Sequence, residues 1–220
     1  MSIKKRFNVY KIPYKQAKPW ILKKHYAHRM PSVSYAFGLY DNKELVGICT
    51  FGITFNYAED DAWGDYDVYE LNRLITEDDL PKNALSYFVS HSLNKMPEPS
   101  VVISYADEGQ GHKGYIYQAT NWIYTGKGGK GVKIYCFSNG KKIHQRSLEN
   151  PDEIKDKIKS GEIEKIIRTE GKHRYYYFVG NKREKRKMKK MLRYEPQPYP
   201  KGENKNYDIG EEVHKQQRLF

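Results

Sequence analysis

A short apolar run that ends in an acidic, glycine-rich turn constrains the fold of this chain more than any other feature. Val101–Ile103 has the composition of a buried strand, and Ser104-Tyr105-Ala106 leads from it to Asp107. Glycines follow, and then Tyr115–Trp122, which we expect to be a short helix. Ligands of α/β sheets bind just beyond the carboxyl ends of strands, so Asp107 is a candidate site residue. The alternative is that Asp107 or Ser104 caps a helix beside glycine turns.

The order of expected elements predicts a mixed α/β (α+β) fold. Strands are expected where apolar and polar residues alternate, and helices where apolar residues recur at helical spacing between prolines. The expected strands are 7–12, 34–40, 45–52, 68–75, 101–105 and 123–126, and the expected helices are 15–30, 83–96 and 115–122. This order favours one mixed central sheet with helices on both faces.

The positive charge of the chain is concentrated in one segment. The formal net charge is +12; residues 1–126 are neutral, residues 127–193 carry +13, and residues 194–220 carry −1. A localised cationic lobe favours a polyanionic partner, most simply nucleic acid, and the interleaved Tyr and Arg side chains can stack on bases. The alternative is a solvated basic helix face. Within this segment we expect strands at 132–137, 141–146 and 173–180, and helices at 151–159 and 182–192; the stretch 163–169 lies between the first of these helices and the last strand.

Composition also excludes several classes of protein. No apolar run is long enough to span a membrane, and no apolar stretch typical of a secretory signal follows Met1–Arg6. Cys49 and Cys136 lie far apart in apolar runs, so we expect reduced, buried thiols without a catalytic role. These features predict a cytoplasmic protein.

Three stretches carry a resemblance to a known family. They are Glu70–Leu74, Ser104–Ala119, and Lys172–Tyr175 together with Pro198–Lys201. As a set they resemble the phage Mom family of adenine-modifying proteins. The order of elements is likewise similar to that of the acetyltransferase-like GNAT fold.

The resemblance implies a GNAT-like enzyme that places a methylcarbamoyl-type group on the N6 amine of adenine in phage DNA, which protects the DNA from restriction. It further implies double-stranded DNA as the partner, a CoA thioester and iron as cofactors, and a phage-infected or prophage-bearing bacterium as the setting. We then expect a GNAT-like catalytic core at 1–126, a basic DNA-binding lobe packed on it at 127–194, and a Pro-rich polar tail, extended or disordered, at 195–220.

The resemblance also points to catalytic residues. Asp107 would accept a proton from the adenine amine, which is a poor nucleophile, and Arg73 would hold a phosphate or carboxylate unless it pairs with Glu70. Tyr117 would donate a proton or stack on the base. His25, with Tyr26, would serve as a metal ligand or proton relay, and His25 with Asp107 forms the candidate iron site. The catalytic candidates are Asp107, Tyr117, Ser104, Arg73, His25 and Tyr26.

The cofactor loop departs from the usual GNAT pattern. GNAT enzymes cradle the CoA pyrophosphate on a glycine-rich loop before the central helix, but Thr76–Ala84 has no glycine and three acids, which would repel a pyrophosphate. Free N–H groups at the helix start can still hold an anion. The cofactor-binding candidates are Lys82, Asn83, Ala84 and Asn121.

The basic segment supplies the candidate phosphate contacts. They are His144, Arg146, His173, Arg174, Lys182, Arg183, Lys185, Arg186 and Lys187. The acidic, aromatic loop 56–67, with Tyr57, Trp63 and Tyr66, is either a lid or part of a device that extrudes the base. Two other functions stay open: an N-acyltransferase acting on a tRNA, protein or small amine, and a catalytically inactive nucleic-acid-binding protein.

Overall fold

The chain is described here by a computed structural model. The structure describes residues 2–25, 29–54, 61–108, 111–128, 131, 133–144, 150–168 and 171–202.

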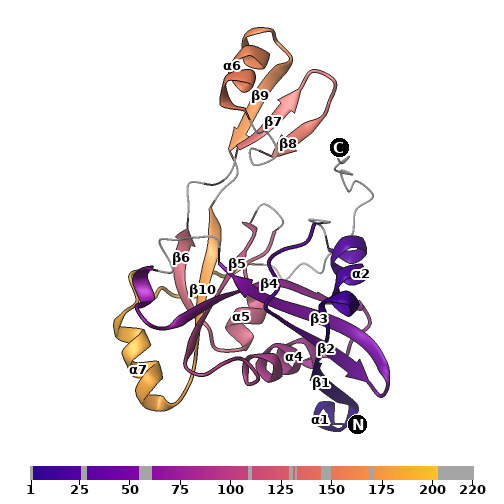
Figure 1. Ribbon diagram of the computed structural model, residues 1–220, viewed down its shortest axis with the longest axis vertical. Helices are drawn as coiled ribbons and strands as arrows, with labels where there is room; N and C mark the ends of the chain where they lie inside the picture. The colour runs from indigo at the N-terminus through magenta and orange to yellow at the C-terminus, as the bar shows by residue number, and fades with distance from the viewer. Residues whose placement is uncertain are drawn as a thin grey trace.

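A seven-stranded sheet forms the centre of the structure (Figure 1). Its order is β1-β2-β3-β4-β5-β10-β6, and neighbouring strands are antiparallel except for the parallel pair β4 and β5. The strands are β1 Phe7–Lys11, β2 Tyr35–Asp41, β3 Glu44–Ile53, β4 Asp67–Thr76, β5 Ser100–Ala106, β6 Ile123–Gly128 and β10 Lys172–Val179. This arrangement confirms the expected mixed α/β sheet flanked by helices.

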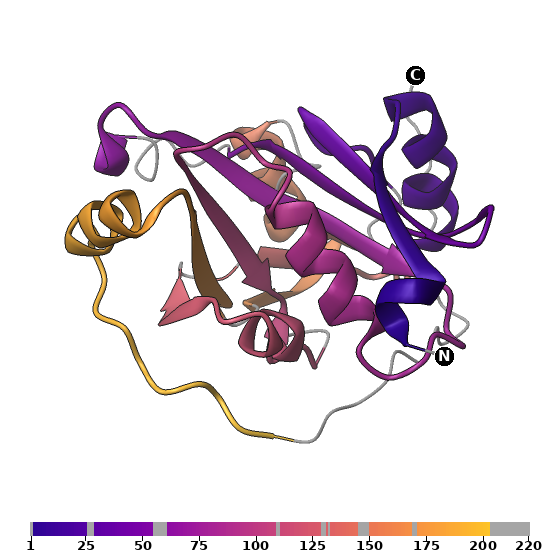
Figure 2. The ribbon, with the colours of Figure 1, turned by 90° about the horizontal axis from the view of Figure 1, so that it is seen from below.

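Helices cover both faces of this sheet (Figures 1 and 2). One face is covered by α1, α4 and α5, and the other by α2 over β2–β4 and by α7 with a 3₁₀ turn, η1, over β5 and β10. The bounds are α1 Ile3–Arg6, α2 Tyr14–Lys24, η1 Asp61–Trp63, α4 Ala84–Leu93, α5 Tyr115–Ala119 and α7 Lys182–Lys190. No helix in the described residues is long and apolar enough to cross a membrane.

Alternation along the strands explains how both faces become buried. Successive strand residues point to opposite faces, and in β3 the neighbours Ile48 and Cys49 belong to different core clusters. In β5, Val102 packs toward α4, while Val101 and Ile103 pack toward α7. A strand buried on both sides is expected to be apolar throughout, which is the composition that identified β5 in the sequence.

The basic segment does not form one lobe. Its first part makes a small sheet, ordered β8-β7-β9, with α6, at one end of the long axis in Figure 1. Its second part, β10 and α7, belongs to the large sheet and its covering layer. The division expected after residue 126 therefore differs from the sheet topology. The elements of the small sheet are β7 Lys133–Phe137, β8 Lys142–His144, α6 Pro151–Lys159 and β9 Ile163–Arg168.

Most of the positive charge of the basic segment lies in the part that joins the large sheet. Residues 172–193 carry ten Lys and Arg against one acid, Glu184, whereas residues 127–171 carry eleven against seven. The dense part of the cationic segment thus lies on the main body of the protein.

Two local expectations differ from the structure. The first helix ends at Lys24 rather than near residue 30. The expected lid lies partly outside the described residues, and its Trp63 is 1% exposed and packs on the rings of Tyr176 and Phe178. Trp63 is therefore a core residue and is not placed to intrude into DNA.

The start of the expected tail is held against the sheet. The backbone N–H of Gln197 donates to the carbonyl of Tyr124 at 2.8 Å, and the Tyr199 hydroxyl donates to the carbonyl of Trp122 at 2.6 Å. Residues 195–202 thus run beside β6 and α5 as an extended strap, and the remainder, 203–220, lies outside the described residues.

Gly52 in β3 allows two chain segments to approach closely. A Cβ at this position would lie 2.0 Å from the carbonyl oxygen of Ser32, which also accepts from Asn72 Nδ2 at 2.8 Å. We expect Gly52→Ala to lower the free energy of unfolding by about 3 kcal/mol, because the obstacle is backbone rather than a flexible side chain. Urea unfolding measures the change.

Gly202→Ala is the matched control, because its nearest non-neighbouring atom would be 3.4 Å from the new Cβ. A Gly52→Ala protein as stable as this control would contradict the close approach.

Candidate functional site

The parallel strands β4 and β5 pair over four residues and then separate. The ladder runs from Asp67↔Ser100 to Glu70↔Ile103. At the next position the Ser104 hydroxyl donates to the carbonyl of Leu71 at 2.8 Å, so a side chain replaces the backbone bond. Beyond this point β4 and β5 no longer pair with each other. Ligands of α/β sheets bind beyond the ends of strands at such a separation.

Tyr117 of α5 is bound to the same serine. Its hydroxyl lies 2.7 Å from Ser104 Oγ. A hydroxyl carries one proton, and the Leu71 carbonyl can only accept, so the Tyr117 hydroxyl is the donor. The structure thus brings together two of the predicted catalytic residues, Ser104 and Tyr117.

The surroundings of Tyr117 fix α5 at this point. Its side chain is 8% exposed and lies against the rings of Trp122 and Tyr175. The helix begins at Gly114, whose φ is +74°, and a Cβ there would lie 2.5 Å from the Tyr175 ring. Burial raises the pKa of the Tyr175 phenol, which donates to the carbonyl of Lys113 at 2.5 Å. Tyr117 therefore holds α5 against the strand end, and its ring is not available to stack on a base.

Asp107 follows β5 directly and remains partly open to solvent. Its carboxylate is 23% exposed and lies 2.9 Å from Lys172 Nζ, at the start of β10. The backbone N–H of His112 donates to the Asp107 carbonyl at 3.1 Å. Burial lowers the pKa of His112. The charge of Asp107 raises this pKa by a smaller amount, so the imidazole is neutral at pH 7. The site thus offers an accessible carboxylate beside a neutral histidine.

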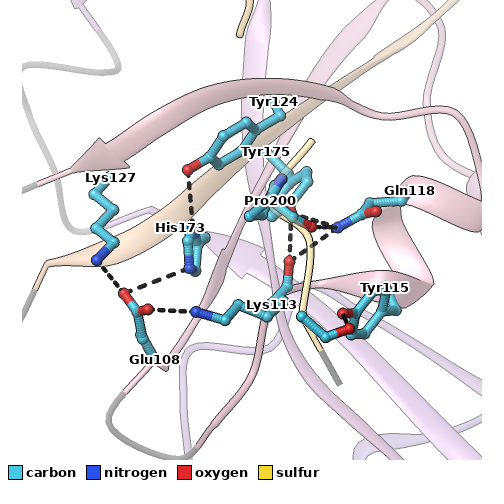
Figure 3. Close-up of polar contacts among 10 residues, drawn as sticks. Glu108, Lys113, Tyr115, Gln118, Tyr124, Lys127, His173, Tyr175 and Pro200 are labelled. Atoms are coloured by element: carbon cyan, nitrogen blue, oxygen red, sulfur yellow. Dashed lines mark hydrogen bonds and ion pairs between the residues drawn. The ribbon is translucent and has the colours of Figure 1, made fainter. Parts of the chain in front are cut away.

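Glu108, which the sequence argument did not single out, lies at the centre of a second network (Figure 3). Its carboxylate contacts Lys113 Nζ at 2.5 Å, forms an ion pair with Lys127, and lies 3.5 Å from Nε2 of His173. These partners come from the turn before α5, from β6 and from β10. Glu108 therefore joins the ends of three segments by charge.

His173 extends this network into the core. Its Nδ1 lies 2.8 Å from the hydroxyl of Tyr124, and its side chain is 3% exposed. Burial raises the pKa of the Tyr124 phenol, so Tyr124 keeps its proton at neutral pH. When the neutral imidazole accepts the hydrogen bond from the Tyr124 hydroxyl at Nδ1, its own proton is on Nε2, which faces Glu108. His173 was expected to contact phosphate at the surface, but the structure buries it.

Arg73 is also held near the separation of β4 from β5. Its guanidinium donates to the backbone carbonyls of Asn72 at 2.6 Å and Arg29 at 3.0 Å. Asn72 occupies a bulge in β4, between the pairs Thr50↔Arg73 and Phe51↔Leu71. Arg73 thus ties the bulge to the segment before β2.

The predicted metal residues come from two different parts of the sheet. His25 caps the C-terminus of α2, which packs on β2, β3 and β4, while Asp107 follows β5 and pairs with Lys172. Tyr26 lies outside the described residues. Among the residues that are described, no group of three or more His, Cys, Asp or Glu is placed to hold a metal ion. The donor set seen here does not fit iron.

The predicted cofactor loop does not fit a pyrophosphate. The backbone N–H of Ala84 donates to the Pro81 carbonyl at 3.0 Å, so it is not directed at a ligand. Asn83 has φ +72°, Lys82 is exposed, and the loop keeps its acidic residues. Asn121 is an exposed turn residue with φ +61° between α5 and β6.

The predicted DNA contacts other than His173 fall into four groups. Arg174 is 5% exposed and faces a pocket beside β6. Lys185 of α7 lies over the ring of Tyr177 at 5.6 Å. The side chain of His144 and all of Arg146 lie outside the described residues. The remaining four share one face of α7 and, together with Lys190, which was not predicted, line a depression of about 380 Å³: Lys182, Arg183, Arg186 and Lys187.

The cysteines are free. Cys49 is fully buried, its thiol lies 3.2 Å from Ser92 Oγ, and burial raises its pKa to about 12. This is the environment of an unreactive thiol, as expected. Cys136 is half-buried rather than buried.

Comparison with solved structures finds two acetyltransferases of low overall similarity. A GNAT-family acetyltransferase of Bacillus cereus is 13% identical, with 80% of this chain and 99% of that chain covered and a TM-score of 0.42. An N-acetyltransferase of Staphylococcus aureus is 9% identical, with 79% and 97% covered and a TM-score of 0.40. Both scores lie below 0.5, so these likenesses carry no argument about function.

Comparison at the level of sequence gives a closer similarity. The chain is 28% identical over 200 residues to the methylcarbamoylase Mom of Escherichia phage Mu, which covers 84% of this chain and 80% of that protein. A family model, the Mom protein family, matches residues 6–201 and so spans β1, the strand-end site and the strap. The chain belongs to the Mom protein family.

Proposed function

We propose that this chain is a transferase that places a methylcarbamoyl-type group on the N6 amine of adenine in double-stranded DNA and so protects the DNA from restriction. The observation that carries the proposal is the match to the Mom protein family over residues 6–201. The identity to the phage Mu methylcarbamoylase supports it. The setting would be the cytoplasm of a phage-infected or prophage-bearing bacterium.

The strand-end site supplies a group that this chemistry needs. Transfer forms a bond between N6 and a carbon of the donor, breaks the bond from that carbon to the donor's leaving group, and removes one proton from N6. Asp107 is the partly exposed carboxylate at the strand end, and Lys172 keeps it oriented. A carboxylate within hydrogen-bond reach of the amine can accept that proton. Ser104 and Tyr117 act as positioning residues, because the Ser104 hydroxyl is bonded to the Leu71 carbonyl and the Tyr117 hydroxyl is bonded to Ser104.

The donor of the group rests on the family resemblance alone. A CoA thioester would supply an activated carbonyl and a thiolate leaving group. The loop at 76–84 does not fit the pyrophosphate of CoA. The donor set in the described residues does not fit iron.

The cationic face of α7 supplies a surface for the DNA backbone. The helix is fixed by buried Met188 and by a hydrogen bond from the Tyr66 hydroxyl to Glu184 at 2.6 Å. The side chains that line its outer face are therefore carried on a rigid element. Phosphate contacts of this kind give affinity and orientation without reading sequence.

Asp107→Asn tests the chemical role. We expect wild-type protein co-expressed with a plasmid to yield a new deoxyadenosine species, and the variant to reduce its amount by about 100-fold or more, because the proton acceptor is lost. Mass spectrometry of the plasmid nucleosides measures this, and fluorescence anisotropy of a labelled duplex should show almost unchanged affinity.

Asp65→Asn, at an exposed turn acid, is the matched control. Full modification by Asp107→Asn would remove Asp107 from the site. Unmodified adenine in the presence of folded wild-type protein would contradict the proposed function.

Replacement of two cations on α7 tests the DNA surface. In Arg183→Gln/Arg186→Gln, the slope of log K against log salt concentration should decrease by about 1.8, because each lost phosphate contact removes about 0.9. Duplex binding titrated at several salt concentrations gives the slope.

Lys185→Gln/Lys189→Gln removes the same charge from the same helix but from residues that do not line the depression. Equal slopes for the two double variants would show that net charge alone, and not this face of α7, binds the DNA.

A further inference from the structure

A pocket of about 410 Å³ lies beside β6, an edge strand of the large sheet. Its walls are formed by the end of β6, by Arg174 of β10, and by the chain that follows α7, including Arg193 and Tyr194. No role assigned above uses the pocket as a whole.

Arg174 is built into the wall in a fixed orientation. Its Nε donates to Thr125 Oγ1 at 2.9 Å and its Nη2 donates to the Thr125 carbonyl at 3.2 Å. The guanidinium carbon lies 3.3 Å from the centroid of the Tyr194 ring. One edge and one face of the guanidinium are therefore held, and a planar group fixed in this way suits a phosphate oxygen better than a flexible ammonium does.

Glycine keeps the space beside the guanidinium open. A Cβ at Gly128 would lie 3.0 Å from Arg174 Nη1. The other small wall residue, Gly126, has φ +81°, and a Cβ there would lie 2.8 Å from the side chain of Gln197. The end of β6 thus leaves room for a ligand beside Nη1.

The charge of the pocket selects an anion. Arg174, Arg193 and Lys127 line it against one carboxylate, that of Glu195. Lys127 also forms the ion pair with Glu108, the residue next to Asp107. Lys127 therefore lies between an anion in the pocket and Glu108, which follows β5 next to Asp107.

We propose that this pocket binds a phosphate group of the DNA backbone and so anchors the strand that carries the target adenine. This inference rests on the proposed function. The same chemistry would accept a phosphate of a nucleotide cofactor, which the experiment separates from DNA.

Two variants test the pocket in different ways. Arg193→Gln removes an exposed cation, and Gly128→Ala fills the space beside Nη1 with every charge kept and without a positive φ to strain. With a labelled duplex we expect each to weaken binding about fivefold, and Arg193→Gln to lower the salt slope by about 0.9. Lys95→Gln, an exposed cation after α4, is the matched control and should bind like wild type.

Coenzyme A and inorganic pyrophosphate are titrated in parallel by calorimetry. Weakened duplex binding by both variants, with these two probes unaffected, supports the DNA phosphate. Weakened binding of coenzyme A with unchanged duplex binding overturns the DNA source and assigns the pocket to a cofactor.

Duplex binding equal to that of the Lys95→Gln control in both variants, with both probes also unchanged, overturns the pocket as a phosphate site. Loss of the modified nucleoside from wild-type cultures would refute the proposed function separately, because duplex binding can still be measured.

Discussion

The hydrogen bond from Ser104 to the Leu71 carbonyl marks the place on which the rest of the site depends. Up to Ile103, β4 and β5 satisfy each other's backbone groups. At Ser104, the side-chain hydroxyl replaces a backbone donor and bonds the Leu71 carbonyl. The Tyr117 hydroxyl of α5 bonds the same serine. Because buried backbone groups must be satisfied, this substitution lets two parallel strands separate without leaving a carbonyl unbonded. The separation brings Asp107 to an exposed strand end.

Charge holds the strand ends together beyond that point. Glu108 contacts lysines from the turn before α5 and from β6, and it lies beside His173 of β10. Asp107 pairs with Lys172, also of β10. The two adjacent acids that follow β5 are thus matched by cations from three other segments. Lys127, which lines the proposed phosphate pocket, pairs with Glu108, the residue next to the candidate catalytic Asp107.

The local parts of this account were predictable from the sequence, and the long-range parts were not. The apolar run at 101–103, the glycine turn and the helix after it follow from composition, and Asp107 was found there by its position; Ser104 and Tyr117 were added by the family resemblance. Glu108 and His173 were separated by 65 positions, so no local pattern linked them, although both lay in the stretches that carry the family resemblance. The topology of the basic segment was hidden for the same reason, because β10 pairs with the distant strands β5 and β6 and buries aromatic side chains on both of its faces. Trp63 resembled an exposed loop residue because its partners, Tyr176 and Phe178, come from a distant strand.

The central claim is that DNA meets this protein at the ends of β5, β6 and β10 and along α7, rather than on the small sheet. Hydrogen–deuterium exchange of the full chain, with and without an adenine-containing duplex, tests it most directly. The account predicts slower exchange at these three strand ends, in residues 193–197 and along α7 when the duplex is bound. Slower exchange confined to β7, β8, β9 and α6 would contradict it.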